Sequence, residues 1–317
     1  METQSPQTTT VSSMMTPGSL FTTSKPPDDV NTNTEYHMVL MAIYSVVLLC
    51  GTISLSLMIY IMKSSTTSTT SIAVLNLIFS HFVFLLTVPF RIHYYAKGNW
   101  IFGAEWCKVA SGMIHIHMYM SFVFYVIILI TRLMMFYCKG EQVASFQRIH
   151  ALIVSAGVWI VVLVTVPCII HYSYGKNATK NTTKSENYTN SGTCFQFGEN
   201  IESAAKVFNY IISMVIIVVA TVLTALQANA LRVLYRKHRQ RCTSQQDFWA
   251  QLKSLFFALI MMVCFVPYHL FRMKYLENIS LQNVNEVFLS LTTFNCLDML
   301  TFLGRRTCYA CFPGKDI

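Results

Sequence analysis

The clearest pattern along the chain is a series of seven long apolar runs separated by short polar segments. Each run is long enough to cross a hydrocarbon core of roughly 30 Å as a helix, because an α-helix rises about 1.5 Å per residue. Inside lipid the backbone groups must bond internally, so the runs predict a bundle of helices. The predicted helices cover residues 38–62, 69–95, 107–136, 149–172, 204–234, 249–275 and 284–303. The predicted fold is an all-α membrane protein, a seven-transmembrane helix bundle over residues 38–303.

The segments before and after this bundle are short and polar. Residues 1–37 are rich in Thr, Ser and Pro, with no basic region ahead of an apolar core. This composition predicts a disordered extracellular tail rather than a signal peptide. Residues 304–317 are predicted to be a short cytoplasmic tail that includes a short interfacial helix. Cys308 and Cys311 in this tail are candidates for palmitoylation, and plain buried thiols are the equal alternative.

Composition and charge place the bundle in a membrane and orient it. Hydrophobic residues make up 54% of the chain and charged residues 12%, whereas about a quarter of a soluble protein is charged. With the N-terminus outside, the outer side is neutral and the inner side carries the whole net charge of +9. A basic inner side suits anionic lipid headgroups and acidic partners. We expect a multi-pass plasma-membrane protein in contact with lipids, and no nucleic-acid partner, because the basic residues are split among short loops.

Of the ten cysteines, only Cys107 and Cys194 fall outside in this orientation. A pair alone in an oxidising compartment predicts a disulfide, which would tie the loop after the fourth helix to the third helix. The same loop carries three Asn-x-Ser/Thr sequons, and a weaker one follows the sixth helix. The candidate glycosylation sites are Asn177, Asn181, Asn187 and Asn278.

Polar groups near the outer ends of the helices are the candidates for ligand binding, because ionisable residues in a membrane usually face the bundle interior. His269 and Arg272 are three residues apart and can share one helix face, and Tyr268 adjoins them. An arginine fork pairs well with a carboxylate or phosphate. We therefore expect a small anionic metabolite or lipid among the third, fifth, sixth and seventh helices. Arg91 and Lys206 lie at comparable depth, but the favoured interpretation of both is an interface residue whose charged end reaches the membrane surface.

No catalytic or metal-binding pattern stands out in the sequence. His-Glu-x-x-His, Gly-x-Ser-x-Gly and a phosphate-binding glycine loop are all absent. His115 and His117 are two residues apart on a helix, so they point to different faces and cannot chelate one ion together. Each is predicted to be a packed or hydrogen-bonded core histidine. We therefore expect no enzyme, no metal and no cofactor.

A set of short motifs, taken in order, resembles the rhodopsin-type (class A) G-protein-coupled receptors over nearly the whole chain after residue 37. The matching residues are Asn76-Leu77, Pro89-Phe90, Trp100-Ile101-Phe102-Gly103, Cys107, Arg132, Trp159, Cys264-Phe265-Val266-Pro267-Tyr268-His269 and Asp298. The Cys-Phe-x-Pro-Tyr-His-x-x-Arg run is similar to the branch of purinergic and lipid-mediator receptors. The resemblance implies a receptor that passes an extracellular signal to heterotrimeric G proteins, with arrestin as a further partner.

The resemblance also implies a set of residues for G-protein contact and switching. That set is Arg132, Asp298, His81, Ser121, Phe265 and Pro267. Thr131 stands where the family has a carboxylate that restrains the arginine, so Arg132 should be less restrained at rest. After Asp298 the usual proline and tyrosine are missing. We expect the receptor architecture to persist and the details of activation to differ.

In the family, the positions of His81 and Asp298 face one central polar cavity, where the aspartate that His81 replaces binds sodium. We expect an ion pair in place of the sodium site, because a carboxylate alone at that depth is strongly destabilising. The alternative is a neutral histidine bonded to Ser121 or to water. Two other function classes stay open: a receptor-like protein that is active without a ligand, and a transporter or channel, although no internal repeat is visible.

Overall fold

The computed structural model describes residues 27–63, 69–137, 144–174, 194–195, 203–240 and 245–302. The described residues form eight α-helices and two 3₁₀ segments and contain no strand. These elements are α1 (Pro27–Lys63), α2 (Thr69–Leu85), α3 (Val88–Lys97), α4 (Ala104–Tyr137), α5 (Ala144–Tyr174), α6 (Ser203–Gln240), α7 (Gln245–Glu277), η2 (Ile279–Leu281), α8 (Gln282–Thr292) and η3 (Thr293–Phe302). The all-α prediction is confirmed.

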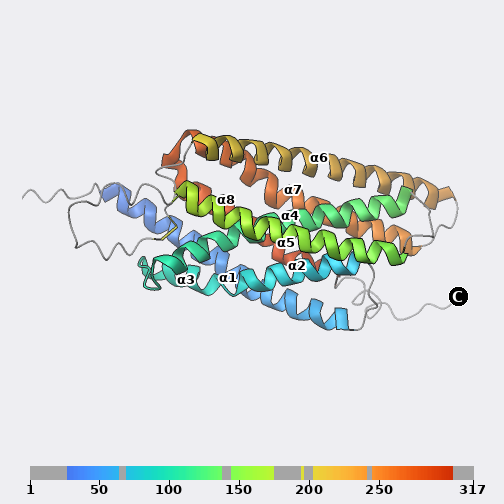
Figure 1. Ribbon diagram of the computed structural model, residues 1–317, viewed down its shortest axis with the longest axis horizontal. Helices are drawn as coiled ribbons and strands as arrows, with labels where there is room; N and C mark the ends of the chain where they lie inside the picture. The colour runs from blue at the N-terminus through green and yellow to red at the C-terminus, as the bar shows by residue number, and fades with distance from the viewer. Residues whose placement is uncertain are drawn as a thin grey trace, which may run out of the picture.

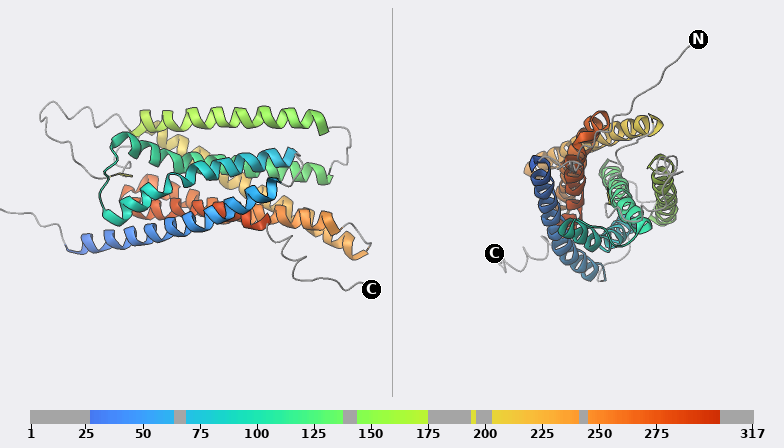
Figure 2. Two further views of the ribbon diagram at one scale, coloured as in Figure 1. Left: turned by 90° about the horizontal axis from the view of Figure 1, so that it is seen from below. Right: turned by 90° about the vertical axis from the view of Figure 1, so that its left-hand side faces the viewer.

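The long helices run side by side along the long axis of the molecule, and in end view they form a ring (Figures 1 and 2). Helix α4 contacts α2, α5, α6, α7 and η3, so it is the central helix of the bundle. Its buried side carries large side chains such as Met118, Met120, Phe124, Tyr125 and Leu129. Because α4 packs against five other elements, its side chains are held firmly in the centre of the bundle. Helix α4 contributes residues to both of the polar sites in the bundle.

Five of the described helices are long and apolar enough to cross a membrane. They lie within α1, α2 with α3, α4, α6 and α7, and α5 contributes a shorter apolar helix over Leu152–Cys168. The seventh predicted span, 284–303, falls on α8 and η3. Many apolar side chains on the outside of the bundle are exposed, as expected for a surface that faces lipid rather than water.

The second predicted helix, 69–95, is divided into α2 and α3 in the structure. Pro89 has no backbone N–H, so it cannot donate to the carbonyl of Leu85 four residues earlier. At the break, the amide of Thr87 donates to the carbonyl of Phe84 at 2.8 Å, and the Thr87 hydroxyl donates to the same carbonyl at 2.7 Å. The predicted second helix is therefore interrupted at Leu86 and Thr87, while Ile72–Lys97 still forms one span that is long enough to cross a membrane.

Two further boundaries differ from the prediction. Helix α1 begins at Pro27, so the last part of the expected disordered segment 1–37 is helical. Pro27-Asp28-Asp29 has a proline and two acids, which favour a helix start. At the other end, the expected α-helix gives way to the 3₁₀ segment η3 at Thr293, whose hydroxyl donates to the Ser290 carbonyl at 2.5 Å. Such back-bonding by threonine distorts helices. Residues 304–317, with Cys308 and Cys311, lie outside the described residues.

Candidate functional site

A disulfide joins Cys107 near the N-terminal end of α4 to Cys194, which follows α5 in the chain. The two Cα atoms are 5.8 Å apart and both cysteines are buried. The bridge predicted from the sequence is confirmed. The next residue, Phe195, has a φ of 68°, and its carbonyl accepts a hydrogen bond of 3.0 Å from the side chain of Gln282 on α8. Cys194 and Phe195 are thus held on two sides, covalently to α4 and by a hydrogen bond to α8.

Arg91 on α3 lies directly beneath this segment and is only 1% exposed. Its guanidinium carbon is 4.3 Å from the centre of the Phe195 ring and 5.5 Å from that of Tyr44. Its nitrogens donate to the carbonyl of Ala110 at 2.8 Å and to the Tyr44 hydroxyl at 3.3 Å. The interpretation of Arg91 as an interface residue is therefore wrong, because the side chain is enclosed by aromatic rings and hydrogen-bonded within the bundle.

A cavity of about 500 Å³ lies under Phe195, between α4, α5, α6, α7 and α8. Most of the surface area that its wall presents is apolar, although many of the lining residues also carry a polar group. Val161 on α5 and Phe208 on α6 line it while 62% and 39% of their surfaces are exposed, so these two positions also reach the outside of the bundle. Its polar lining consists of Ser111, His115, Tyr119, Thr165, Asn209, Tyr268, Arg272, Tyr275, Gln282, Asn285 and Glu286.

The structure brings only part of the predicted binding set to this cavity. Tyr268 and Arg272 line it, and Arg272 is 8% exposed with its guanidinium 5.2 Å from the Tyr275 ring centre. His269 is buried but instead lies 3.1 Å from the Ser213 hydroxyl on α6. Lys206 and Arg91 are not among the lining residues. Helix α7 therefore supplies the cavity with Arg272 and Tyr268, while His269 connects α7 to α6.

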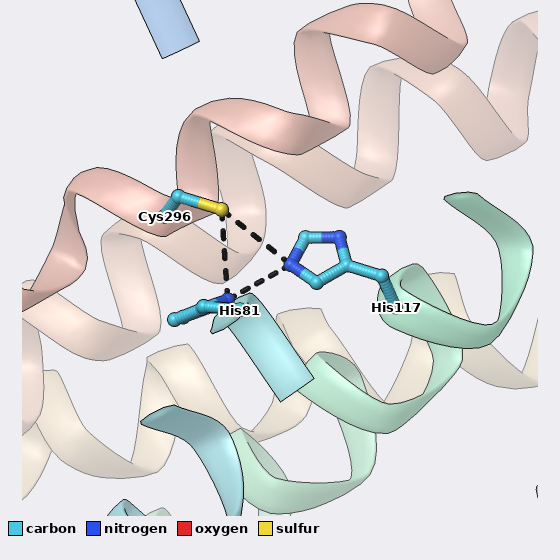
Figure 3. Close-up of side chains that lie close together, drawn as sticks. All are labelled: His81, His117 and Cys296. Atoms are coloured by element: carbon cyan, nitrogen blue, oxygen red, sulfur yellow. Dashed lines mark hydrogen bonds between the residues drawn. The ribbon is translucent and has the colours of Figure 1, made fainter. Parts of the chain in front are cut away.

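A second polar cluster lies inside the bundle, where α2, α4 and η3 meet (Figure 3). The Nδ1 atom of His81 is 2.8 Å from Nε2 of His117, and the sulfur of Cys296 is 3.6 Å from each of these nitrogens. On its other side, Nε2 of His81 is 3.5 Å from a carboxylate oxygen of Asp298. The Tyr125 hydroxyl donates to the other oxygen of that carboxylate. All five side chains are buried.

The interior cluster contains the predicted His81–Asp298 pair, together with partners that sequence reasoning missed. His81 bonds to His117 rather than to Ser121, whose hydroxyl has no hydrogen-bond partner among the described residues. His115 lines the cavity under Phe195 while His117 faces His81, so the two histidines do occupy different faces. A signal for His117 was present: it precedes Ser121 by four residues and so shares its helix face.

At the opposite end of α4, Arg132 is half-buried, and the described part of the chain offers it no carboxylate partner. The preceding Thr131 donates its hydroxyl to the carbonyl of Ile127 at 2.7 Å. Thr131 therefore bonds within α4, and its side chain carries no charge that could pair with Arg132. The arginine therefore lacks the restraint that a neighbouring acid would supply.

The remaining predicted residues that the structure describes lie outside the two polar sites. Phe265 is fully buried and forms edge-to-face contacts with Phe122 and Tyr125, at centroid distances of 5.8 and 6.2 Å, and Pro267 lies inside α7. Asn278 is exposed, and its side chain accepts a bond from the Ser280 amide. The sequons at Asn177, Asn181 and Asn187 lie outside the described residues.

Comparison with known proteins adds independent information. The sequence profile of the 7 transmembrane receptor (rhodopsin family) matches residues 53–300. The probable G-protein coupled receptor 141 of Homo sapiens is 39% identical over 274 residues, which cover 83% of this chain and 87% of the relative. The 2-oxoglutarate receptor 1 of Rattus norvegicus is 26% identical, covering 75% and 69%. Lysophosphatidic acid receptor 4 of Homo sapiens is 29% identical, covering 80% and 70%.

Proposed function

Since the chain belongs to the rhodopsin family of seven-transmembrane receptors, we propose that its outer cavity binds a small anionic metabolite or lipid and that Arg272 anchors the anionic group. The chain is a G-protein-coupled receptor and a multi-pass protein of the plasma membrane. Membership of this family implies coupling to a heterotrimeric G protein, and it replaces the transporter or channel that the sequence alone left open. The ligand, arrestin and lipid contacts are proposals.

The observation that carries this proposal is the position of Arg272 in the wall of a largely apolar cavity of about 500 Å³. A guanidinium is always charged and presents a planar fork of donors that matches carboxylate and phosphate. Its pairing with an anion is stronger in a cavity that excludes water than at an exposed surface. The apolar remainder of the wall suits the hydrocarbon part of a ligand.

Neighbouring groups set the orientation of the proposed ligand. Tyr268 and Tyr275 flank Arg272 in the wall and offer hydroxyl groups, and His115 faces the same space from α4. Glu286 also lines the cavity, and one of its carboxylate oxygens has no hydrogen-bond partner in the described part of the chain. We assign Glu286 the recognition of a donor group on the ligand. His269 does not contact the ligand in this proposal; its hydrogen bond to Ser213 fixes the position of α7 against α6.

The names of several relatives are compatible with this ligand class. Three of them are a 2-oxoglutarate receptor, a lysophosphatidic acid receptor and a cysteinyl leukotriene receptor. Each of these named molecules carries a carboxylate or phosphate group. Their identity to this chain is 25% to 29%, so they support the chemical class of the ligand and no particular molecule.

A second candidate is a receptor that signals without a ligand. It is favoured by Arg132, because no carboxylate among the described residues holds this arginine. In that case the cavity would have no role in activation, and added ligands would change the basal signal little.

The test is a signalling screen of carboxylate metabolites and lysophospholipids on the wild-type receptor, Arg272→Ala and Arg272→Lys. A matched control is Lys206→Ala, which removes a cation of α6 that does not line the cavity. The proposal expects an active anion whose potency falls at least about tenfold in Arg272→Ala and is unchanged in Lys206→Ala. Equal potency in all four proteins would remove Arg272 from the site. A high basal signal that no compound changes would favour the second candidate.

A further inference from the structure

We propose that His81, His117 and Cys296 bind one divalent transition-metal ion of the zinc class in the interior of the bundle (Figure 3). The ion would join α2, α4 and η3. This inference concerns a site separate from the outer cavity, and it does not rest on the proposed anionic ligand. It also revises the expectation that the chain holds no metal.

The spacing of the three donor atoms is close to that of a tetrahedral zinc site. With Zn–S near 2.3 Å and Zn–N near 2.05 Å, a tetrahedral angle places sulfur about 3.6 Å from nitrogen and the two nitrogens about 3.4 Å apart. Both sulfur–nitrogen distances are 3.6 Å in the structure. The two nitrogens are 2.8 Å apart, so the rings must separate by only about 0.6 Å.

The donor types select the class of ion. Imidazole nitrogen and thiolate sulfur suit zinc and its neighbours in the first transition row, whereas sodium, magnesium and calcium require oxygen ligands. The nearby carboxylate of Asp298 lies on the far side of the His81 ring from the sulfur and the second histidine. It is therefore placed to act on the histidine and not as a ligand.

Asp298 supplies the outer support that metal-binding histidines commonly have. If His81 binds through Nδ1, its Nε2 carries the proton and lies 3.5 Å from an Asp298 oxygen, an ion-pair distance that a small ring movement would shorten to a hydrogen bond. This carboxylate–histidine arrangement fixes the tautomer and the ring orientation and raises the basicity of the ligand nitrogen. Tyr125 in turn donates to the other carboxylate oxygen, so the supporting acid is itself held in place.

Charge balance favours the ion in this buried place. The Cys296 thiol releases its proton on binding, because the thiolate is the ligand. One thiolate and the Asp298 carboxylate then offset the two positive charges of the ion, so the cluster as a whole is neutral. A neutral cluster avoids the large penalty of an uncompensated charge at this depth.

Buried polar atoms on α4 and η3 offer hydrogen-bonding partners for a further oxygen ligand. The Ser121 hydroxyl, Nδ1 of His117 and both amide atoms of Asn295 are buried without hydrogen-bond partners in the described residues. Ser121 follows His117 by one helical turn on the same face, and Asn295 adjoins Cys296. Zinc sites with three protein ligands keep the fourth position for water.

The bound ion would regulate the receptor by holding three helices in one arrangement. A ligand shifts a conformational equilibrium only by its difference in affinity between states. The three donors come from three separate elements, so any motion that separates α2, α4 and η3 breaks the site. The metal would therefore stabilise the arrangement described here against states in which these elements move apart.

The test measures thermal unfolding of purified full-length receptor with a chelator, with Zn²⁺ and with Mg²⁺. The variants are His81→Asn, His117→Asn and Cys296→Ser; the matched controls are His37→Gln and Cys50→Ser, which change the same residue types on α1. At a hundredfold excess over Kd, Zn²⁺ should raise the Tm of the wild type by about 4 °C, and Mg²⁺ should not. Each cluster variant should lose the shift, and both controls should keep it.

Elemental analysis and cobalt substitution complete the test. The wild type should retain one equivalent of metal after gel filtration, and Co²⁺ should give a sulfur-to-metal charge-transfer band that Cys296→Ser lacks. An equal Zn²⁺ shift in wild type and cluster variants would place the ion elsewhere and overturn the proposal. A wild type that neither shifts nor retains metal would also overturn it and leave the three side chains as a hydrogen-bonded cluster only.

Discussion

The imidazole Nε2 of His81 lies 3.5 Å from a carboxylate oxygen of Asp298, and both side chains are fully buried in the interior of the bundle. Removing one partner of such a pair leaves a buried polar group without its compensation, whereas removing both leaves a smaller defect. Their contributions to stability should therefore be coupled.

The first prediction is a non-additive double-mutant cycle. Thermal unfolding of His81→Ala, Asp298→Ala and the double variant, measured with a chelator present, should give a coupling energy of about 1 to 3 kcal/mol. Because an imidazole occupies the expected sodium position, wild-type stability should also be the same at low and high sodium concentration. Additive losses would exclude the pair, and stabilisation of the wild type by sodium would mean that a cation site persists.

The second prediction concerns the disulfide between Cys107 and Cys194. The bridge closes a loop of 87 residues, and loss of such a constraint costs roughly 4 to 5 kcal/mol in the chain-entropy description. Cys107→Ser and Cys194→Ser should each lower surface expression and Tm strongly, and the double variant should be no worse than either. Intact mass before and after reduction should show one bridge. Two free thiols in surface-expressed protein would contradict this expectation.

The third prediction tests whether Arg91 stabilises the fold from inside the bundle or only reaches the membrane surface. Arg91→Ala removes both hydrogen bonds and the contact with Phe195, and leaves the Tyr44 hydroxyl and the Ala110 carbonyl without this partner. We expect a loss of about 2 to 4 kcal/mol in stability, because buried hydrogen bonds to a charged group contribute about 1.5 to 3 kcal/mol each. Lys206→Ala is the matched control and should change stability by less than about 0.5 kcal/mol. Equal, small losses of stability in both variants would contradict the buried role and favour a position of Arg91 at the membrane interface.

The fourth prediction restores an acid beside Arg132. Thr131→Asp places a carboxylate next to the arginine, which should hold it in the resting state and lower the basal signal. Asparagine has the shape of aspartate without its charge, so Thr131→Asn controls for loss of the Thr131–Ile127 hydrogen bond. G-protein activation without added ligand, normalised to surface expression, gives the measurement. An unchanged basal signal in Thr131→Asp would show that Arg132 does not limit it.

The sequence predicted the bundle well because lipid imposes a simple requirement on apolar runs, and the paired outer cysteines have one economical explanation. Even the break at Thr87 has a cause in the sequence, since Pro89 removes one helical hydrogen bond. Its result, two helices rather than one kinked helix, depends on how the Thr87 side chain and the neighbouring turns bond.

The site was less predictable because it depends on contacts between distant helices. Arg91 resembles an interface residue in sequence, and only the position of Phe195, 104 residues further on, shows that it is enclosed. Likewise, His117 and Cys296 are ordinary core residues until α4 and η3 are packed together. Sequence spacing within one helix correctly separated the faces of His115 and His117, but it contains no information on what each face meets.

The exposed positions in the cavity wall affect how a ligand would reach it. Val161 and Phe208 belong both to the wall and to the outer surface of the bundle, which in a membrane is covered by acyl chains. A ligand with an alkyl tail gains about 0.8 kcal/mol for each methylene that leaves water, so it accumulates in the bilayer before it meets the receptor. Occupancy would then follow the mole fraction of ligand in lipid. Apparent potency in water would consequently fall as more membrane is added to the assay.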